Sequence, residues 1–220
     1  IPGTVGAAPV QNVGAYGQEI VQVLDSVLAY DLKEEKYVTI KKEDMKLGYR
    51  SSIFNHGEDA GRYLIISMTI HLSHDTLTPP FYTSLQNYVE EHQITDFSPK
   101  SIREMVTEIR WSKLPKPEEM ASSGSFFKNV YLDDAEADRL RGMNVPVWEG
   151  NKVPSGWLID HAGLKGMVFH GMRVSEKAAL ILINESAQSY AHLKQAREEI
   201  VSIIEKKYGL TLQQEPVELE

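Results

Sequence analysis

The segment 122–129 combines side chains that could handle an anionic ligand. The glycine before Ser125 lets the backbone approach a ligand closely and can hold the serine hydroxyl in a turn. The pair Phe126–Phe127 follows, and two aromatic side chains can be buried to anchor that turn. Lys128 and Asn129 then add a cation and an amide donor. An ordinary serine and glycine loop ahead of a strand would show the same pattern, so the residues alone leave both interpretations open.

A second segment, Gly48–Phe54, places one arginine among side chains that are suited to packing. Arg50 is expensive to bury there unless its guanidinium finds anionic or carbonyl partners. A ligand carboxylate would be such a partner, and so would an ordinary surface carboxylate.

Residues 1–17 are rich in glycine around Gln11 and Asn12, and Pro2 and Pro9 stiffen the path of the chain. Glycines permit positive φ and let backbone N–H groups face a bound cofactor. The segment is not a dinucleotide fingerprint, because no strand precedes it and no G-x-G-x-x-G opens a helix. A plain connecting loop is the alternative interpretation.

Composition excludes several classes of protein. A net charge of −8 argues against a nucleic-acid surface, which needs clustered Lys and Arg. Zero cysteines exclude disulfides and thiolate chemistry. No apolar run reaches the ~20 residues that span a bilayer and no leader is visible, so we expect a cytoplasmic protein without a membrane partner. His71 and His74 lack further ligands for a metal, and His161 beside Asp160 lacks the serine elbow of a hydrolase.

Hydrophobic periodicity predicts an α+β fold. The first part should form an antiparallel sheet from strands at 19–30, 37–40 and 62–72. A proline-containing loop at 76–82 leads into a polar run at 86–96. A helix should then begin at Ser98, its N-cap, and end at the proline-containing stretch Lys113–Pro117.

The second part should form a compact α+β unit with a single apolar helical stripe in its core. The expected elements are a helix at 133–143, a helix from Ser155 to Gly163, strands at 167–174 and 178–184, and a helix at 186–208 that is capped by Ser186 and carries the stripe Tyr190, Leu193, Ala196, Ile200, Ile203 and Ile204. An extended tail follows. We therefore expect domains at 1–115 and 116–209, and a tail at 210–220.

Taken together with 157–160 and 164–167, these segments resemble the UDP-N-acetylenolpyruvoylglucosamine reductase family. The resemblance runs in order from Ile1 to the last residues. It implies part of a two-part FAD-binding α+β region with an antiparallel sheet, followed by a smaller substrate-binding domain. It also implies the NADPH- and FAD-dependent reduction of UDP-N-acetylglucosamine enolpyruvate to UDP-N-acetylmuramate, a precursor of the bacterial cell wall.

The resemblance assigns roles residue by residue. It implies catalytic roles for Arg50, Ser125 and Glu215, the last of these in the pattern Leu-x-x-Glu, so that the tail would return to the active site. Flavin contacts are implied for Gly3, Thr4, Val5, Gly6, Gln11, Gly14 and Arg50. Substrate contacts are implied for Tyr82, Lys113, Asn129 and Lys165.

Some of these assignments have ordinary alternatives. By pattern alone Lys113 is a solvated lysine at a helix end, Glu215 is a terminal carboxylate, and Tyr88 competes with Tyr82. Ala8 stands where many members of the family carry a serine.

The chain starts inside what reads as a ligand loop, so we expect an N-terminal part of the flavin-binding region to be missing. A different flavin oxidoreductase of the same fold and a non-catalytic substrate-binding module are the rival interpretations.

Overall fold

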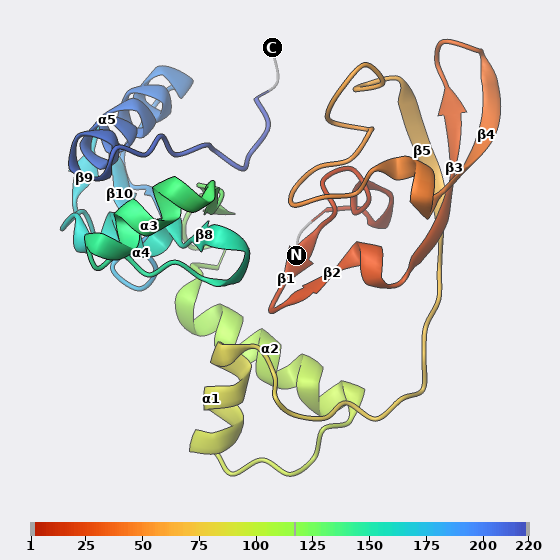
Figure 1. Ribbon diagram of the computed structural model, residues 1–220, viewed down its shortest axis with the longest axis horizontal. Coiled ribbons are helices and arrows are strands. Elements are labelled where there is room, and N and C mark those ends of the chain that lie inside the picture. The colour runs from red at the N-terminus through yellow and green to blue at the C-terminus, as the bar shows by residue number, and fades with distance from the viewer. Residues whose placement is uncertain (1–2, 117, 219–220) are drawn as a thin grey trace. The chain divides into compact units, whose positions relative to one another are not determined.

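The structure is a computed structural model that describes residues 3–116 and 118–218. Two prolines lie outside the described residues. These are Pro2, which is predicted to stiffen the opening segment, and Pro117, which is predicted to help end a helix. The chain divides into two compact units, Ile1–Ile109 and Arg110–Glu220 (Figure 1). Among the described residues, no helix is long and apolar enough to cross a membrane. The expected boundaries at 115 and 209 stay a prediction.

An antiparallel sheet forms the centre of the first unit. Its strands are β3 (Leu24–Asp31), β4 (Lys36–Lys41) and β5 (Tyr63–Ile70), in the order β4-β3-β5. Both pairings are antiparallel, so the predicted sheet is confirmed. One face of the sheet packs onto a cluster of buried residues that includes Val27, Ala29, Met45, Ile53 and Phe54.

The prediction of a continuous strand from residue 19 is wrong, because a 3-10 helix, η2 (Ile20–Gln22), interrupts it. Glu19 and Gln22 form a capping box, in which the Glu19 N–H donates to the Gln22 side chain at 3.0 Å. Reciprocal bonds of this kind satisfy N–H groups that a strand would have to pair elsewhere. Local hydrogen bonding therefore overrides the β propensity of these residues.

Short elements surround the sheet and shape the loops of the first unit. They are η1 (Val5–Ala7), the two-stranded hairpin of β1 (Gly14–Ala15) and β2 (Gln18–Glu19), and η3 (Lys42–Met45).

Two helices follow the sheet, α1 (Thr83–Glu91) and α2 (Pro99–Lys113). The second confirms the predicted helix, and the Ser101 N–H donates to the Ser98 hydroxyl at 3.3 Å as an N-cap requires. The sequence predicts no helix over the polar run at 86–96, yet α1 covers half of it. Leu85 and Val89, four residues apart, bury one face of α1 in a cluster with Met105 and Ile109.

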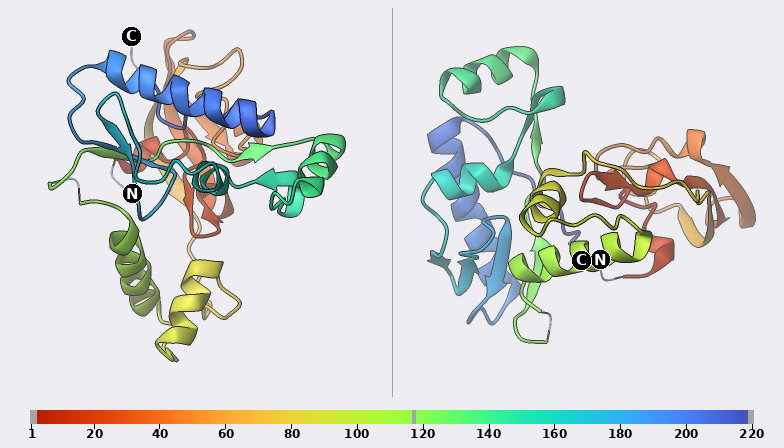
Figure 2. Two further views of the ribbon diagram at one scale, coloured as in Figure 1. Left: turned by 90° about the vertical axis from the view of Figure 1, so that its left-hand side faces the viewer. Right: turned by 90° about the horizontal axis from the view of Figure 1, so that it is seen from below.

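The described residues of the second unit form a four-stranded antiparallel sheet and the helices given below, which confirms the α+β class. Strand order is β6-β11-β10-β9, formed by β6 (Ser122–Ser125), β11 (Ile181–Asn184), β10 (Met172–Val174) and β9 (Val168–Phe169). The helices are α3 (Asp134–Gly142), α4 (Ser155–His161) and α5 (Tyr190–Tyr208). Figure 2 shows α5 alongside this sheet, where it contacts β9, β10 and α4. A short pair, β7 (Val130–Tyr131) and β8 (Lys152–Val153), and η4 (Glu149–Asn151) complete the unit.

The single strand predicted at 167–174 is instead the hairpin of β9 and β10. Its turn contains His170 and Gly171, whose φ values of 49° and 83° lie in the left-handed region. Two consecutive residues with positive φ make the tight turn that reverses a hairpin. An added Cβ at Gly171 would lie 2.6 Å from the Ala187 nitrogen, so only glycine fits there.

The last helix begins later than predicted. Its N-cap is Ser189 rather than Ser186, because the Asn184 side chain bonds both the N–H and the carbonyl of Ala187 and holds a turn ahead of the helix. Ala196, Ile200 and Ile204 are fully buried, as the apolar stripe predicts. Tyr190 is 52% exposed, so its assignment to the core is wrong.

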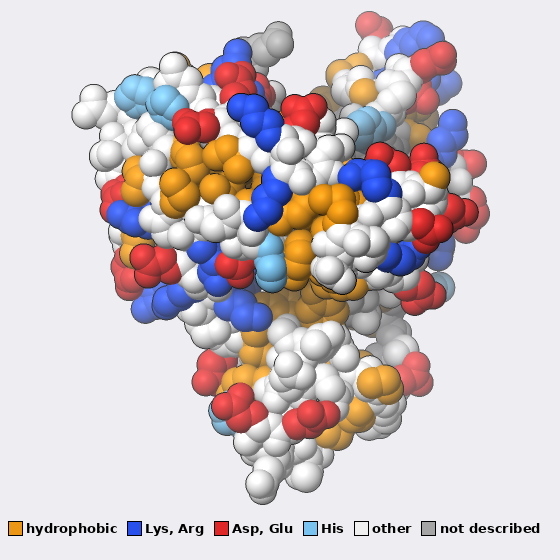
Figure 3. Space-filling model, turned by 60° about the vertical axis from the view of Figure 1, so that its left-hand side comes forward, with side chains coloured by type: hydrophobic (Ala, Val, Ile, Leu, Met, Phe, Trp, Pro, Cys, Tyr) orange, Lys and Arg blue, Asp and Glu red, His pale blue; other side chains and the backbone are white. Residues whose placement is uncertain are grey.

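Acidic and basic side chains mix on the face of the molecule that Figure 3 draws, without a continuous basic patch on that face. This agrees with the net charge of −8.

One buried ion pair ties the β3–β4 turn to the start of β5. The Asp31 carboxylate, 2% exposed, accepts from Arg62 Nε at 2.9 Å and from Arg62 Nη2 at 2.6 Å. The N–H groups of Lys33 and Glu34 bond the same carboxylate. These bonds, that of Arg62 above all, hold the pKa of Asp31 well below its usual value.

Replacing Asp31 with asparagine should lower the midpoint of thermal unfolding by several degrees at neutral pH, because Arg62 loses its carboxylate partner. Because the pKa of Asp31 is lower in the folded chain, its stabilising contribution is present above the ordinary pKa of about 3.9 and is lost below it. The Asp31→Asn variant should therefore lose less stability on acidification. Thermal melts followed by circular dichroism between neutral pH and about pH 3 test this. Asp75→Asn, an exposed control, should follow the parent chain, and equal acid dependence in both variants would contradict the prediction.

Candidate active site

The C-terminal tail of the second unit runs beside the residues that follow Ser125. Lys128 N–H donates to the Gln213 carbonyl at 2.8 Å, and Glu215 N–H donates to the Phe126 carbonyl at 2.7 Å. Phe127 and Gln214 face each other as an antiparallel bridge. Neighbouring strands lie about 4.8 Å apart. The structure therefore places Glu215 on an extended segment next to the one that carries Ser125.

Buried side chains anchor both segments. Phe126 and Phe127 are 3% and 1% exposed, with their rings edge to face at 5.1 Å between centroids. Leu210 and Leu212 of the tail are buried, while the residues between and after them are exposed, which is the alternation of a strand. The predicted extended conformation of the tail is thus present. The aromatic anchor that the sequence predicts is present as well.

The Ser125 side chain stays exposed between these anchors, at the end of β6. Gly124 before it has φ 74°, a left-handed conformation that glycine adopts without strain. On its other side, the Phe126 N–H donates to the Leu180 carbonyl at 2.7 Å. The backbone at Ser125 is therefore held by pairing with β11 and by the bond of Phe126, while the Ser125 side chain remains accessible.

Asn129 is held at the start of α4. Its Oδ1 accepts from the N–H of Ser155 at 3.1 Å, and the buried Ser155 hydroxyl donates to the Lys128 carbonyl at 2.6 Å. Because this bond uses the amide oxygen, a contact between Asn129 and a substrate phosphate would use the Nδ2 donor. From the sequence, Ser155 is recognised only as the start of a helix. In the structure it bonds both Lys128 and Asn129 and so fixes their positions.

The two candidate lysines lie on different elements of the second unit. Lys113 is the exposed last residue of α2. Lys165 lies in the turn after α4, where its Nζ is 3.1 Å from the Asp160 carboxylate. Their contacts with a substrate stay predictions.

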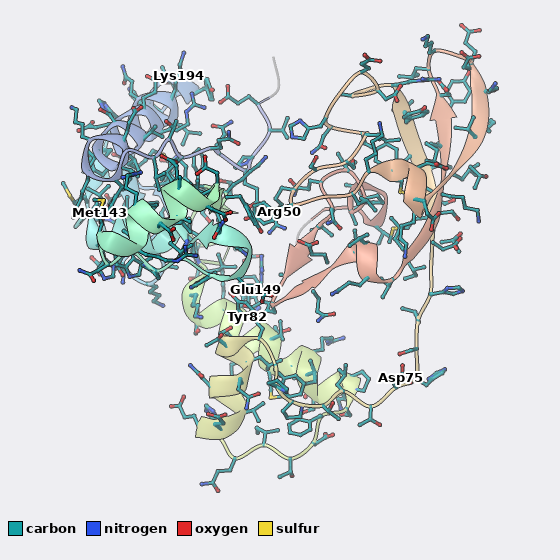
Figure 4. The ribbon with its side chains drawn as sticks, viewed as in Figure 1. Arg50, Asp75, Tyr82, Met143, Glu149 and Lys194 are labelled. Atoms are coloured by element: carbon teal, nitrogen blue, oxygen red, sulfur yellow. The ribbon has the colours of Figure 1, made fainter. Side chains whose placement is uncertain are left out.

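Arg50 lies in the first unit, on the turn that connects η3 to β5 (Figure 4). Its φ of 53° is left-handed, and Gly48 and Ser51 close the turn with a pair of backbone hydrogen bonds. The Nη2 atom of Arg50 donates to the Gly14 carbonyl at 3.0 Å. A carbonyl is one of the two partners that the sequence suggests for this guanidinium.

A buried asparagine joins the loops around Arg50. Asn12 is 1% exposed, and its Nδ2 donates to the Gly48 carbonyl at 3.0 Å and to Glu19 Oε2 at 2.8 Å. Its Oδ1 accepts from the N–H of Val21 at 3.1 Å. Sequence reasoning selected the neighbouring Gln11, which is half-buried, because a pattern of residues does not show which of two adjacent amides turns inward.

Tyr82 stands at the N-terminal end of α1 and is 47% exposed (Figure 4). Its ring packs edge to face on Tyr16 at 6.1 Å between centroids. Gly17, between β1 and β2, lies against the same ring, since an added Cβ would be 3.4 Å from it. Tyr82 therefore borders the hairpin whose Gly14 carbonyl holds Arg50.

Gly6, one of the glycines at the start of the chain, lies where the described residues leave room for a side chain. Gly6 has no positive φ, and an added Cβ would meet nothing nearer than 3.8 Å, at the Ile65 carbonyl. The packing of the chain therefore does not require a glycine at this position, whereas a closely approaching cofactor would. Val5 is 69% exposed and Thr4 is exposed beside it. These residues fit the proposed flavin contact.

The fold is that of a two-unit α+β protein whose C-terminal tail, with Glu215, pairs with the segment that follows Ser125. Residues 116–219 match the family model described as "UDP-N-acetylenolpyruvoylglucosamine reductase, C-terminal domain". Reductases of that name from Ralstonia nicotianae and Neisseria gonorrhoeae are 36% and 37% identical to the chain, over 99% and 98% of its length. The chain belongs to the UDP-N-acetylenolpyruvoylglucosamine reductase family, as the motifs indicated.

A crystal structure of UDP-N-acetylenolpyruvylglucosamine reductase from Thermus caldophilus has the same fold. It matches 98% of this chain and 60% of its own, with a TM-score of 0.58 and 19% identity. The chain spans 65% and 64% of the length of the Ralstonia and Neisseria reductases.

In the opening segment of the chain, the packing requires a glycine at position 14. An added Cβ would lie 2.7 Å from Glu19 Cγ, 2.9 Å from the Gln18 carbonyl and 3.4 Å from Arg50 Nη1. We expect Gly14→Ala to destabilise the folded chain by about 1–3 kcal/mol, since overpacking displaces backbone as well as side chains. Urea unfolding measures the change. Gly6→Ala is the matched control and should change stability little. An equal cost at both glycines, or none at Gly14, would contradict the prediction.

Proposed function

We propose that the protein reduces the enolpyruvyl ether of UDP-N-acetylglucosamine enolpyruvate to UDP-N-acetylmuramate, using FAD and NADPH, in the cytoplasmic synthesis of peptidoglycan precursors. Membership of the reductase family supports this proposal. The observation that supports it most directly is the hydrogen bond from the Glu215 N–H to the Phe126 carbonyl, because it holds the backbone of Glu215 beside the residue that follows Ser125.

The first unit would hold the flavin. Bound FAD, reduced by NADPH, would supply the hydride. The proposed contacts are Gly3, Thr4, Val5, Gly6, Gln11, Gly14 and Arg50. The exposed glycine backbone suits a flat ring system, and the turn held by Asn12 would orient the guanidinium of Arg50.

The catalytic residues would stabilise the negative charge that develops on the substrate when hydride adds to it. When the hydride bonds to the methylene carbon of the substrate, the electron pair of the double bond moves toward the adjacent carbon and its carboxylate. Arg50 would stabilise this negative charge by a charge-assisted hydrogen bond. Glu215 would stabilise it only while it carries or shares a proton, because an ionised glutamate would repel the carboxylate.

Ser125 would complete the reduction. Its hydroxyl would donate a proton to the carbon next to the carboxylate, forming the C–H bond of the lactyl ether, and the serine would recover a proton from a lysine or from water. Holding a weak acid beside a strongly basic carbon is what makes this transfer feasible. The pairing of β6 with β11 and the buried Phe126 and Phe127 would supply that position.

The substrate diphosphate would be held by donors and cations. Tyr82, Lys113 and Asn129 are the proposed contacts with the diphosphate, and Lys165 is a further proposed contact with the substrate. Lysine ammonium groups bind phosphate as point charges, and the amide of Asn129 adds a directed donor.

A non-catalytic substrate-binding module is the second candidate for the chain taken alone. A flavin oxidoreductase acting on a different substrate is less consistent with a serine and a carboxylate on adjacent segments.

Replacing Ser125 with alanine or Glu215 with glutamine should lower kcat by about 10²–10⁴-fold, the usual contribution of a proton donor or of electrostatic stabilisation. The protein used should have the full length of its relatives. Reduction of the flavin by NADPH should change little, because neither side chain takes part in it. Stopped-flow spectroscopy separates the two half-reactions. Ser123→Ala is the matched control and should keep full turnover, whereas unchanged turnover in both test variants would reject the assigned roles.

The 220-residue chain by itself should bind FAD weakly or not at all, because the relatives that it matches are about half as long again. The absorbance of flavin bound to the purified chain, with and without added FAD, tests this expectation. A chain extended to the length of its relatives is the comparison and should bind FAD tightly. Tight stoichiometric binding by the 220-residue chain would contradict the prediction.

A further inference from the structure

The tail around Glu215 is held in place by side chains of α5. Beyond Leu212 the described tail residues are half-buried or exposed, so apolar burial contributes little to their position. Arg197 bridges this stretch, because its Nη1 donates to the side chains of both Gln214 and Glu218. The Arg197 side chain is only 19% exposed. The Arg197 guanidinium therefore binds the tail at Gln214 and at Glu218, on both sides of Glu215.

Two hydrogen bonds within the tail stabilise the conformation that Arg197 binds. Gln214 Nε2 donates to Glu218 Oε1 at 2.8 Å and to the Pro216 carbonyl at 2.9 Å. Residues 214–218 thus form a compact turn whose two ends meet at Arg197. Glu215 lies within this turn.

Tyr190 supports the contact from the start of α5. It is seven residues before Arg197, a spacing that places both side chains on one face of the helix. Hydrogen bonds from Tyr190 and then Arg197 lower the pKa of Glu218, so this carboxylate stays ionised at neutral pH. An ionised Glu218 keeps its charge-assisted bond to the guanidinium.

The two backbone bonds to residues 126 and 128 fix the register of the tail, and the side-chain bonds fix the path beyond it. Errors of about 1 Å in a reacting group can cost large factors in rate. From these contacts we infer that Arg197 is a positioning residue for Glu215, acting through Gln214 and Glu218. The inference rests on the function proposed above.

The test uses the reductase at the full length of its relatives. Arg197→Ala should lower kcat by about tenfold or more while flavin reduction by NADPH stays within about twofold. Arg197→Lys should retain only part of the activity, because lysine keeps the charge but lacks the planar fork. Lys194→Ala, one turn earlier on α5 and paired with Glu198, is the matched control and should keep full turnover.

A double-mutant cycle distinguishes positioning from general damage. If Arg197 acts through Glu215, Arg197→Ala should have little further effect in a Glu215→Gln background. Full multiplication of the two losses, or an unchanged kcat in Arg197→Ala, would overturn the inference. Unchanged turnover in Glu215→Gln alone would instead overturn the role proposed for Glu215.

A second variant covers the case in which Arg197→Ala does not fold. Glu218→Gln removes the carboxylate partner at an exposed position, with its side chain 42% accessible. It should lower kcat in the same direction and increase hydrogen exchange at residues 213–218. Unchanged kcat together with unchanged exchange would overturn the inference.

Discussion

The pairing of the C-terminal tail with the segment after Ser125 is the constraint on which the second unit's candidate site depends. Two short backbone hydrogen bonds join segments that are far apart in sequence, and both segments contribute buried residues to one hydrophobic cluster, namely Phe126, Phe127, Leu210 and Leu212. A buried backbone group without a partner is costly, so burial of the anchors and pairing of the backbone reinforce each other. Any change that loosens the anchors would also release Glu215.

In the first unit, segments that are far apart in sequence are joined by a buried polar residue, Asn12. Asn12 satisfies both of its functional groups internally, and in doing so it joins the glycine-rich loop, the η2 turn and the turn of Arg50. The positive φ of Arg50 is held by this turn, because Gly48 and Ser51 pair across it. A guanidinium on such a turn loses less freedom on binding an anion than one on a flexible loop would. The arrangement is compatible with the carboxylate contact proposed for Arg50.

The two kinds of glycine in this chain carry different information. At Gly14 and Gly171 the surrounding atoms leave no room for a Cβ, so packing alone explains the residue. At Gly6 the described atoms leave room for a Cβ, so their packing does not explain the glycine. Sequence patterns treat all of these positions alike, and only the surrounding atoms show which glycines the packing requires.

The sequence by itself determined the α+β class, the three-stranded sheet, the α2 helix with its Ser98 cap, and the family. These depend on local periodicity, on capping chemistry within a few residues, and on motifs that can be read in order. It also identified Ser125 and Glu215 as candidates, through the motifs of the family.

Only the tertiary structure decided that the tail lies beside Phe126, that Asn12 and not Gln11 is buried, and that Arg197 holds the tail. It also decided where β9 ends, since Gly171 lies against the backbone of Ser186 and Ala187. Each of these features depends on which distant segment pairs or packs with which. Local patterns do not contain that information, because the free energy of a long-range contact depends on both partners and on everything buried between them.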